Sequence, residues 1–277
     1  MGVFLALASA AGYGLVDFAG GVLSRRAHFA VVTFLGQLGG LLFAGAAALA
    51  VPAHTARLPD LLWGALSGAG SAVAMHFLNR GLSRGAMSVV VPVSAVTGVA
   101  LSVVCGVLFL GDRPSPLAWL GICVTVPALW LVAGGGSAQG PGRLPADGLT
   151  ASAGVAVQYL GLAQADPVSG LWPVAVGRLA AVLLLLPGVR RHRAGFRDAG
   201  PGLAVPAVLT GAGAALALIL YLWATRQQML SVAVVLASLY PAVPTVLGLA
   251  VLHEKVTRAQ AAGLGGAAVA VVLLSLG

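Results

Sequence analysis

The chain has 277 residues, of which 59% are hydrophobic and 8% are charged, and its formal net charge is +8. A soluble domain carries about 25% charged residues, so this chain has too little charge to cover a water-facing surface, and a soluble enzyme or binding domain is excluded. The basic residues lie in short segments between apolar blocks, without the interleaved aromatics of a nucleic-acid groove. The fold class predicted is an all-α polytopic membrane protein, because apolar blocks of roughly 18 or more residues are typical of membrane-spanning helices.

Taken in chain order, the breaks between the apolar blocks predict ten transmembrane helices. Clear breaks lie at Arg25-Arg26, at Arg84 and at Asp112-Arg113. The predicted spans cover residues 3–22, 29–51, 61–82, 87–110, 116–133, 148–165, 168–187, 203–225, 230–252 and 259–276.

A Gly-, Pro- and Ser-rich segment, GGGSAQGPGRLPAD (134–147), is predicted to be a linker between two halves of five spans each, residues 1–133 and 148–277. The halves resemble each other. SGAGSA (67–72) matches TGAGAA (210–215) at an offset of 143, and GQLGGLL (36–42) matches GRLAAVL (177–183) at an offset of 141. Because each half has an odd number of spans, the second must enter the membrane from the opposite side. We therefore expect a five-plus-five inverted repeat with a substrate site near the midplane.

The same alignment pairs polar residues inside the spans: Asp17 with Gln158, and Gln37 with Arg178. A charged side chain at a helix centre costs about 2.5–3.5 kcal/mol on insertion scales and usually faces the bundle interior. The four side chains are predicted to line a central polar cavity. Alternatives stay open for these residues. Asp17 could form a structural hydrogen bond or pair with Arg178. The two glutamines could serve only to join neighbouring helices by hydrogen bonds.

Further candidates for the cavity wall are four tyrosines that lie deep in predicted spans, although their hydroxyls could equally serve helix packing. They are Tyr13, Tyr159, Tyr221 and Tyr240. Pro241 and Pro244 remove backbone hydrogen bonds in the ninth span and predict a kink, which could act as a gate or be static. The cysteines and histidines show no ligand spacing, so no metal and no cofactor are expected.

Each half resembles one EamA-type unit of the drug/metabolite transporter superfamily. The second half carries YPAVPTVLGLAVLHEKVTRAQAAGLGGAAVAVVLL (240–274), in which Pro241 precedes Glu254 by thirteen residues. The first half has LGDRPSPLAWLG, with Asp112 in place of the glutamate and Val99 in place of the proline. The resemblance also covers Arg178, where members often have an arginine. It implies ten helices in an inverted repeat, alternating access, and movement of small metabolites, often outward.

The function predicted is a secondary transporter of small metabolites or drugs in the cytoplasmic membrane, an exporter that works by alternating access. Its partners would be the lipid bilayer and a small-molecule substrate; a coupling proton or cation stays open. The alternatives are a membrane-embedded lipid-modifying enzyme and a non-transporting scaffold. An enzyme would need clustered acids, histidines or a nucleophile with its base, and of the seven acidic residues only Asp17 lies well inside a span. We therefore do not expect an enzyme.

Two arguments about membrane orientation conflict. The loops after the odd-numbered spans carry eleven basic residues and those after the even-numbered spans, with both termini, carry three. Cytoplasmic loops hold the excess of Lys and Arg, so the charge count predicts that both termini face outward. Members of the resembled family commonly have both termini inside. We follow the charge count, because it is a property of this chain and its loops are short.

Overall fold

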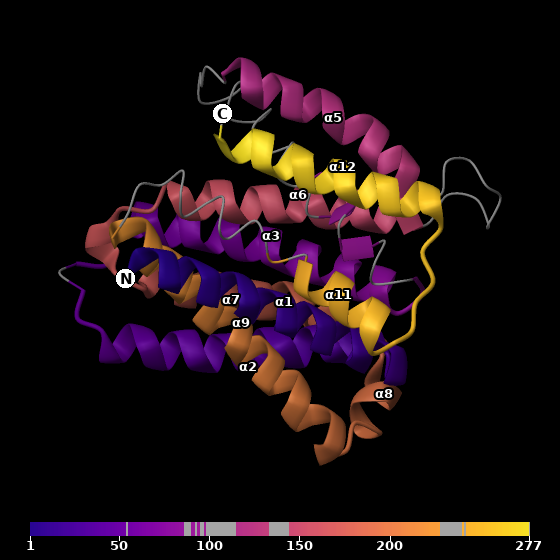
Figure 1. Cartoon of the computed structure of the whole chain (residues 1–277). Coiled ribbons are helices and arrows are strands. Elements are labelled where there is room, and N and C mark those ends of the chain that lie inside the picture. The colour runs from indigo at the N-terminus through magenta and orange to yellow at the C-terminus, as the bar shows by residue number, and fades with distance from the viewer. Residues whose placement is uncertain are drawn as a thin grey trace.

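The computed structural model describes residues 1–53, 55–85, 90, 91, 93, 94, 97, 115–132, 144–227, 240 and 242–276 (Figure 1). Within these ranges all regular structure is helical, as predicted. In chain order the elements are α1 (Gly2–Arg26), α2 (Phe29–Ala50), α3 (Leu58–Leu82), α5 (Pro116–Val132), α6 (Leu144–Ala163), the short 3₁₀ turn η2 (Pro167–Ser169), α7 (Trp172–Arg191), α8 (Arg193–Arg197), α9 (Pro201–Gln227), α11 (Ala242–Ala250) and α12 (Arg258–Leu276).

Five of the described helices are long and apolar enough to cross a membrane: α1, α2, α3, α7 and residues Pro201–Ala224 of α9. Only 39–44% of their most apolar windows is buried inside the protein. The rest of this apolar surface faces outward, as it should where lipid replaces water as the solvent. The five helices coincide with the predicted first, second, third, seventh and eighth spans.

The other predicted spans are described only in part. Helices α5, α6 and α12 fall on the fifth, sixth and tenth spans, and α11 falls on the end of the ninth. Nearly all of the fourth predicted span lies outside the described residues. Helix α6 begins at Leu144, within the last residues of the predicted linker. Asp147 in its first turn forms an ion pair with Arg80 of α3, which ties the start of α6 to the bundle.

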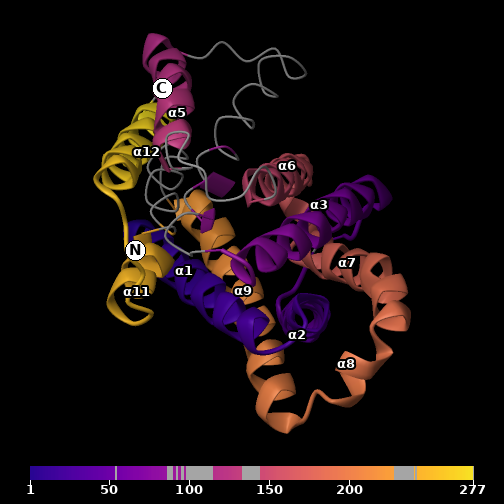
Figure 2. The same cartoon turned by 90° about the vertical axis from the view of Figure 1, so that its right-hand side faces the viewer.

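Helix α3 packs against α6 and α7, while α9 packs against α1 and α2 (Figure 2). Two of these crossings depend on glycine. A Cβ on Gly68 of α3 would lie 1.8 Å from the carbonyl oxygen of Gly177 in α7, and one on Gly211 of α9 would lie 1.6 Å from that of Gly36 in α2. The backbones therefore touch directly, as small residues permit in membrane helices. Helices α5 and α12 pack on each other (Figure 1).

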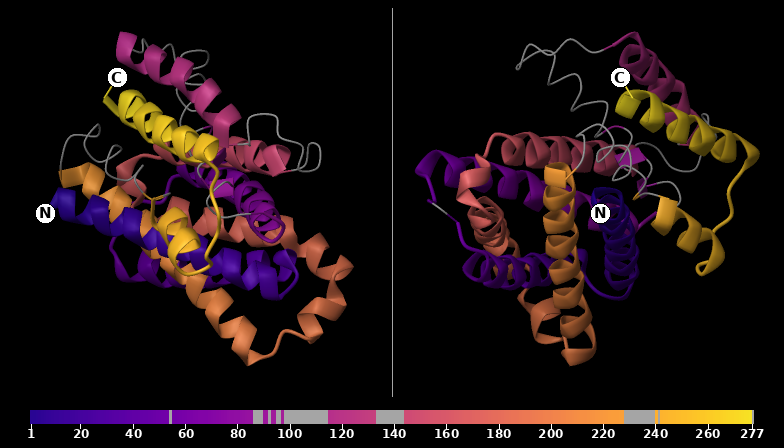
Figure 3. Two further views of the ribbon diagram at one scale, coloured as in Figure 1. Left: turned by 45° about the vertical axis from the view of Figure 1, so that its right-hand side comes forward. Right: turned by 60° about the vertical axis from the view of Figure 1, so that its left-hand side comes forward.

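The two ends of the bundle differ in chemistry. At one end, here called the basic end, the Arg25 guanidinium donates to the carbonyl oxygens of Leu82 and Gly85 and forms an ion pair with Glu254 at 2.8 Å. These contacts bring together the last turn of α1, the end of α3 and the segment before α12. Helix α8 lies at this end, whereas α1 begins and α12 ends at the other (Figure 3).

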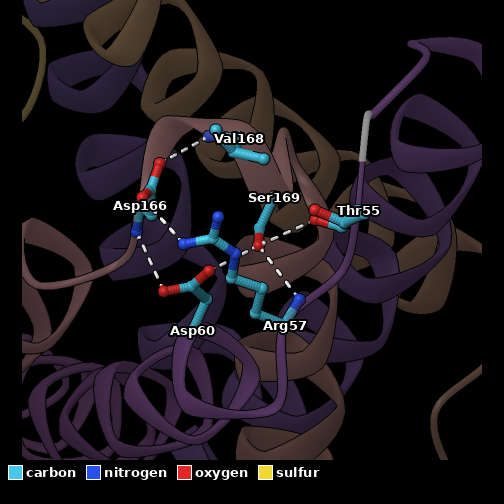
Figure 4. A network of polar contacts seen from close by, with 6 residues as sticks. All are labelled: Thr55, Arg57, Asp60, Asp166, Val168 and Ser169. Atoms are coloured by element: carbon cyan, nitrogen blue, oxygen red, sulfur yellow. Dashed lines mark hydrogen bonds and ion pairs between the residues drawn. The ribbon is translucent and has the colours of Figure 1, made fainter.

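At the opposite end, a polar network joins the α2–α3 connection to the α6–α7 connection (Figure 4). The Ser169 hydroxyl donates to Asp60 Oδ2 at 2.6 Å and accepts from the Arg57 amide at 3.2 Å. The Asp166 amide donates to Asp60 Oδ1 at 3.0 Å, and Arg57 pairs with the Asp166 carboxylate at 3.3 Å. The network fixes the ends of four helices relative to one another.

Candidate functional site

Three buried polar side chains from three helices meet between the two halves of the chain. Arg178 of α7 donates from one terminal nitrogen to Gln37 Oε1 of α2 at 2.9 Å and to Ser71 Oγ of α3 at 3.2 Å. Gln37 Nε2 donates in turn to Ser71 Oγ at 3.3 Å. The repeat alignment pairs Gln37 with Arg178, and the structure brings these two residues into direct contact. We call Gln37, Ser71 and Arg178 the central triad.

Small residues make this meeting possible. The aliphatic stem of Arg178 passes Gly40 of α2, where an added Cβ would lie 3.2 Å from its Cδ. On α3, Gly64, Gly68 and Ser71 follow one another at spacings of four and three, so they share one helix face. That face packs on the start of α7, which aims Ser71 at Arg178. Sequence reasoning missed Ser71 because its repeat equivalent is Ala214; the small-residue face was the signal that could have found it.

A small cavity lies on each side of the central triad, and Arg178 lines both. The first has a volume of only about 10 Å³ and is lined by Ser67, Gln158, Pro173 and Leu218 among others. The second has a volume of about 20 Å³ and is lined by Thr33, Met75, Asn79 and Thr210 among others. Half-buried Gln158 of α6 lines the first cavity together with Arg178, and among the described contacts its side chain has no hydrogen bond to the central triad.

The second cavity contains a polar pair that the sequence did not indicate as part of the site. Buried Asn79 of α3 donates from Nδ2 to Thr33 Oγ1 of α2 at 2.9 Å. Their repeat equivalents, at offsets of 143 and 141, are Leu222 and Val174. The two cavities therefore differ in polarity: the one nearer the basic end has the additional hydrogen-bonding groups.

Asp17 and Tyr13 lie one turn apart on α1 and are both directed into the protein. Asp17 is only 6% exposed, and no other described residue forms a hydrogen bond or ion pair with its carboxylate. The Tyr13 hydroxyl is buried without a hydrogen-bond partner among the described residues. Its ring lies 6.3 Å from that of Tyr240, and it is within electrostatic range of Asp17, Arg178 and Tyr221. The described hydrogen bonds of Arg178 go to Gln37 and Ser71.

The remaining predicted site residues are described incompletely. The side chain of Tyr159 and all of Pro241 lie outside the described residues. Pro244 is buried in α11, and a kink or gate at these prolines stays a prediction. In the part of the chain that the structure describes, no three His, Cys, Asp or Glu side chains gather as metal ligands would.

Comparison with known proteins gives one family and a related fold. Residues 1–134 match the EamA-like transporter family. A solved structure titled only "Crystal structure of protein" has the same fold with a TM-score of 0.56, at 19% sequence identity; the likeness covers 93% of this chain and 96% of that one. Among curated proteins no match is found.

Proposed function

Because residues 1–134 match the EamA-like transporter family, we propose that the chain is an integral membrane protein of the drug/metabolite transporter type. In this proposal it is a secondary transporter of small metabolites or drugs that works by alternating access around the central triad. The proposal adds the ten-span inverted repeat, the mechanism, and outward transport across the cytoplasmic membrane.

Helix contacts between the halves support the inverted repeat. Suppose that α1, α2 and α3 are the repeat equivalents of α6, α7 and α9. A two-fold relation between the halves then requires that each contact between two of these helices recur between their repeat equivalents. The contact of Gly68 with Gly177 has as its counterpart the contact of Gly211 with Gly36. Likewise, the packing of α3 on α6 corresponds to that of α9 on α1. Residues on a two-fold axis meet their own equivalents, as Gln37 and Arg178 do.

The observation that carries the proposal is that the two cavities are related by the same offsets. Ser67, Gly68, Val174, Gly177 and Leu218 line the first, and their equivalents Thr210, Gly211, Thr33, Gly36 and Met75 line the second. Two equivalent half-cavities on opposite sides of one buried contact are what alternating access needs. Substrate would enter one half-cavity, exchange hydrogen bonds with the triad, and leave through the other.

Asp17 is the proposed site for a coupling proton or cation. Its buried carboxylate has no described bonding partner, while the orphaned Tyr13 hydroxyl lies on the same face of α1 one turn away. An ionisable group retained in such surroundings marks an ion or substrate pathway more often than a packing contact. A lipid-modifying enzyme or a scaffold has no comparable support, because neither would need paired half-cavities.

The test is transport in proteoliposomes containing the purified full chain. Uptake of a panel of radiolabelled amino acids, sugars, nucleosides and cationic dyes would be measured with and without a pH gradient. Protein-free liposomes and Arg178→Gln proteoliposomes are the controls. We expect at least one compound to accumulate only with the wild-type protein. Equal accumulation with wild type and Arg178→Gln for every compound would contradict the proposal.

A further inference from the structure

Four exposed arginines gather where α7 ends and α8 begins, at the basic end. They are Arg190, Arg191, Arg193 and Arg197. The only acidic residue in the segment 188–200 is Asp198. None of the four guanidinium groups forms an ion pair or hydrogen bond with another described residue, whereas Arg25 and Arg80 at the same end are paired with Glu254 and Asp147. We call these four residues the arginine cluster.

An apolar strip leads along α7 to this cluster. Leu179, Leu183 and Leu186 are 44%, 55% and 41% exposed and precede Arg190 at spacings of four, three and four. Residues at these spacings lie on one helix face. The opposite side of α7 carries the buried residues, including Val174, Arg178 and Ala181. The strip therefore presents apolar side chains to the bilayer and ends in a guanidinium at the membrane surface.

Helix α8 is docked on the bundle. The His192 ring stacks on His28 at the start of α2 with a centroid distance of 4.0 Å, and Phe196 packs edge-on against Phe34 at 5.6 Å. Gly195 lies against Val31 of α2. These residues face α2, whereas Arg193 and Arg197, one turn apart, are exposed.

Membrane orientation alone does not require the cluster. Without its four arginines, the loops of the basic end still carry seven basic residues against three on the other side. The docked helix and the leucine strip also have no role in orientation. A ligand with a negative charge next to a long apolar chain would use the arginine cluster, the leucine strip and the docked helix α8 together.

We propose that the arginine cluster and the leucine strip of α7 form a binding site for an anionic phospholipid. The phosphate would accept hydrogen bonds from Arg190 and Arg193, and an acyl chain would lie along Leu186, Leu183 and Leu179. Phosphate and guanidinium groups match in charge and in bidentate geometry. The site does not depend on what the protein transports.

The proposal can be tested on the purified full chain by native mass spectrometry, titrating phosphatidylglycerol and phosphatidylcholine with identical acyl chains. Each arginine near an anionic headgroup contributes about a fivefold change in affinity. We expect the wild type to prefer phosphatidylglycerol by at least about tenfold, and Arg190→Gln/Arg193→Gln to bind it about 25-fold more weakly with phosphatidylcholine unchanged. Should this variant not fold, the single variant Arg190→Gln replaces it, with an expected loss of about fivefold in phosphatidylglycerol affinity.

The matched control is Arg84→Gln/Arg258→Gln, which removes the same charge from exposed positions at the same end. It should change phosphatidylglycerol binding by less than about threefold. Equal affinity of the wild type for both lipids would overturn the proposal, and so would an equal loss in the control variant. Displacement of the lipid by inorganic phosphate at equal concentration would point to an anion site without the leucine strip, and would overturn it too.

Discussion

At the residue scale, the central feature is a buried arginine whose described hydrogen bonds go to neutral oxygens of Gln37 and Ser71. Arg178 is only 5% exposed, and a guanidinium so placed must keep donors satisfied as the protein changes conformation. Bonds to neutral acceptors are weaker than bonds to a carboxylate. The triad is therefore a contact that a substrate could exchange without a large energetic cost.

Exchanging Gln37 and Arg178, the two repeat-equivalent residues of the central triad, tests whether they lie on a two-fold axis. Arg178→Gln alone should lower transport at least about tenfold, because it removes the guanidinium. The double variant Gln37→Arg/Arg178→Gln should recover a large part of that loss, since the guanidinium then reaches the same point from α2. Initial rates in proteoliposomes measure both. A swap no better than the single variant would show that the two positions are not equivalent.

Asp17→Asn separates transport from folding. The amide has the shape of the carboxylate, and no described bond to Asp17 is lost, so we expect the melting temperature to change by less than about 5 °C. Transport should fall at least about tenfold if the group carries an ion or contacts substrate. Thermal unfolding and transport would be measured on the same preparation. Parallel loss of both would favour a structural role.

At the element scale, helix crossings depend on glycines rather than on large interlocking side chains. Gly68→Ala would force the α3 and α7 backbones apart, because the new methyl group would overlap the Gly177 carbonyl. We expect a loss of about 1–3 kcal/mol in stability. Gly45→Ala is the matched control, since a Cβ there meets nothing within 4 Å; it should be neutral or stabilising. Similar melting temperatures for the two variants would contradict the close crossing.

A second element-scale prediction concerns the junction of α2 with α8. Burial, together with the nearby His192 and Arg84, holds the pKa of His28 below its usual range. The unfolded chain takes up this proton near about pH 6.5, whereas the folded protein takes it up only at lower pH. The unfolded state then binds more protons, so stability falls as pH drops below about 6.5.

The expected outcome is a melting temperature that declines between pH 7.5 and pH 5.5, and declines less in His28→Asn. Asparagine is chosen because the His28 ring caps α2 by accepting from the Ala30 amide, and Asn can replace that cap. Identical pH profiles for the two proteins would show that His28 does not contribute.

At the scale of the whole molecule, the contacts of Arg25, the ion pair of Arg80 and the docking of α8 gather the basic segments at one end. The charge rule predicts that this end is cytoplasmic. On a background without Cys105 and Cys123, a cysteine in place of the exposed Ala194 (Ala194→Cys) should resist an impermeant thiol reagent in intact cells, and a C-terminal cysteine tag should react. The reverse labelling pattern would place the basic end outside.

Composition and periodicity were enough to predict an all-helical membrane protein, and the described helices agree with most of the predicted spans. These features depend on local physics: a long apolar segment can bury its backbone polar groups in lipid only as a helix. The sequence also placed Gln37 and Arg178 at equivalent positions, because a repeat preserves spacing along the chain.

Other features depend on how helices cross, and only the tertiary structure decided them. Ser71 joins the triad, Thr33 pairs with Asn79, and Asp147 pairs with Arg80 because helices from different parts of the chain meet at particular heights. Ser71, Thr33 and Asn79 have apolar repeat equivalents, so the alignment that found Gln37 and Arg178 could not find them. The packing of the bundle determines which side chains line the same cavity. The spacing of residues along a single helix cannot predict it.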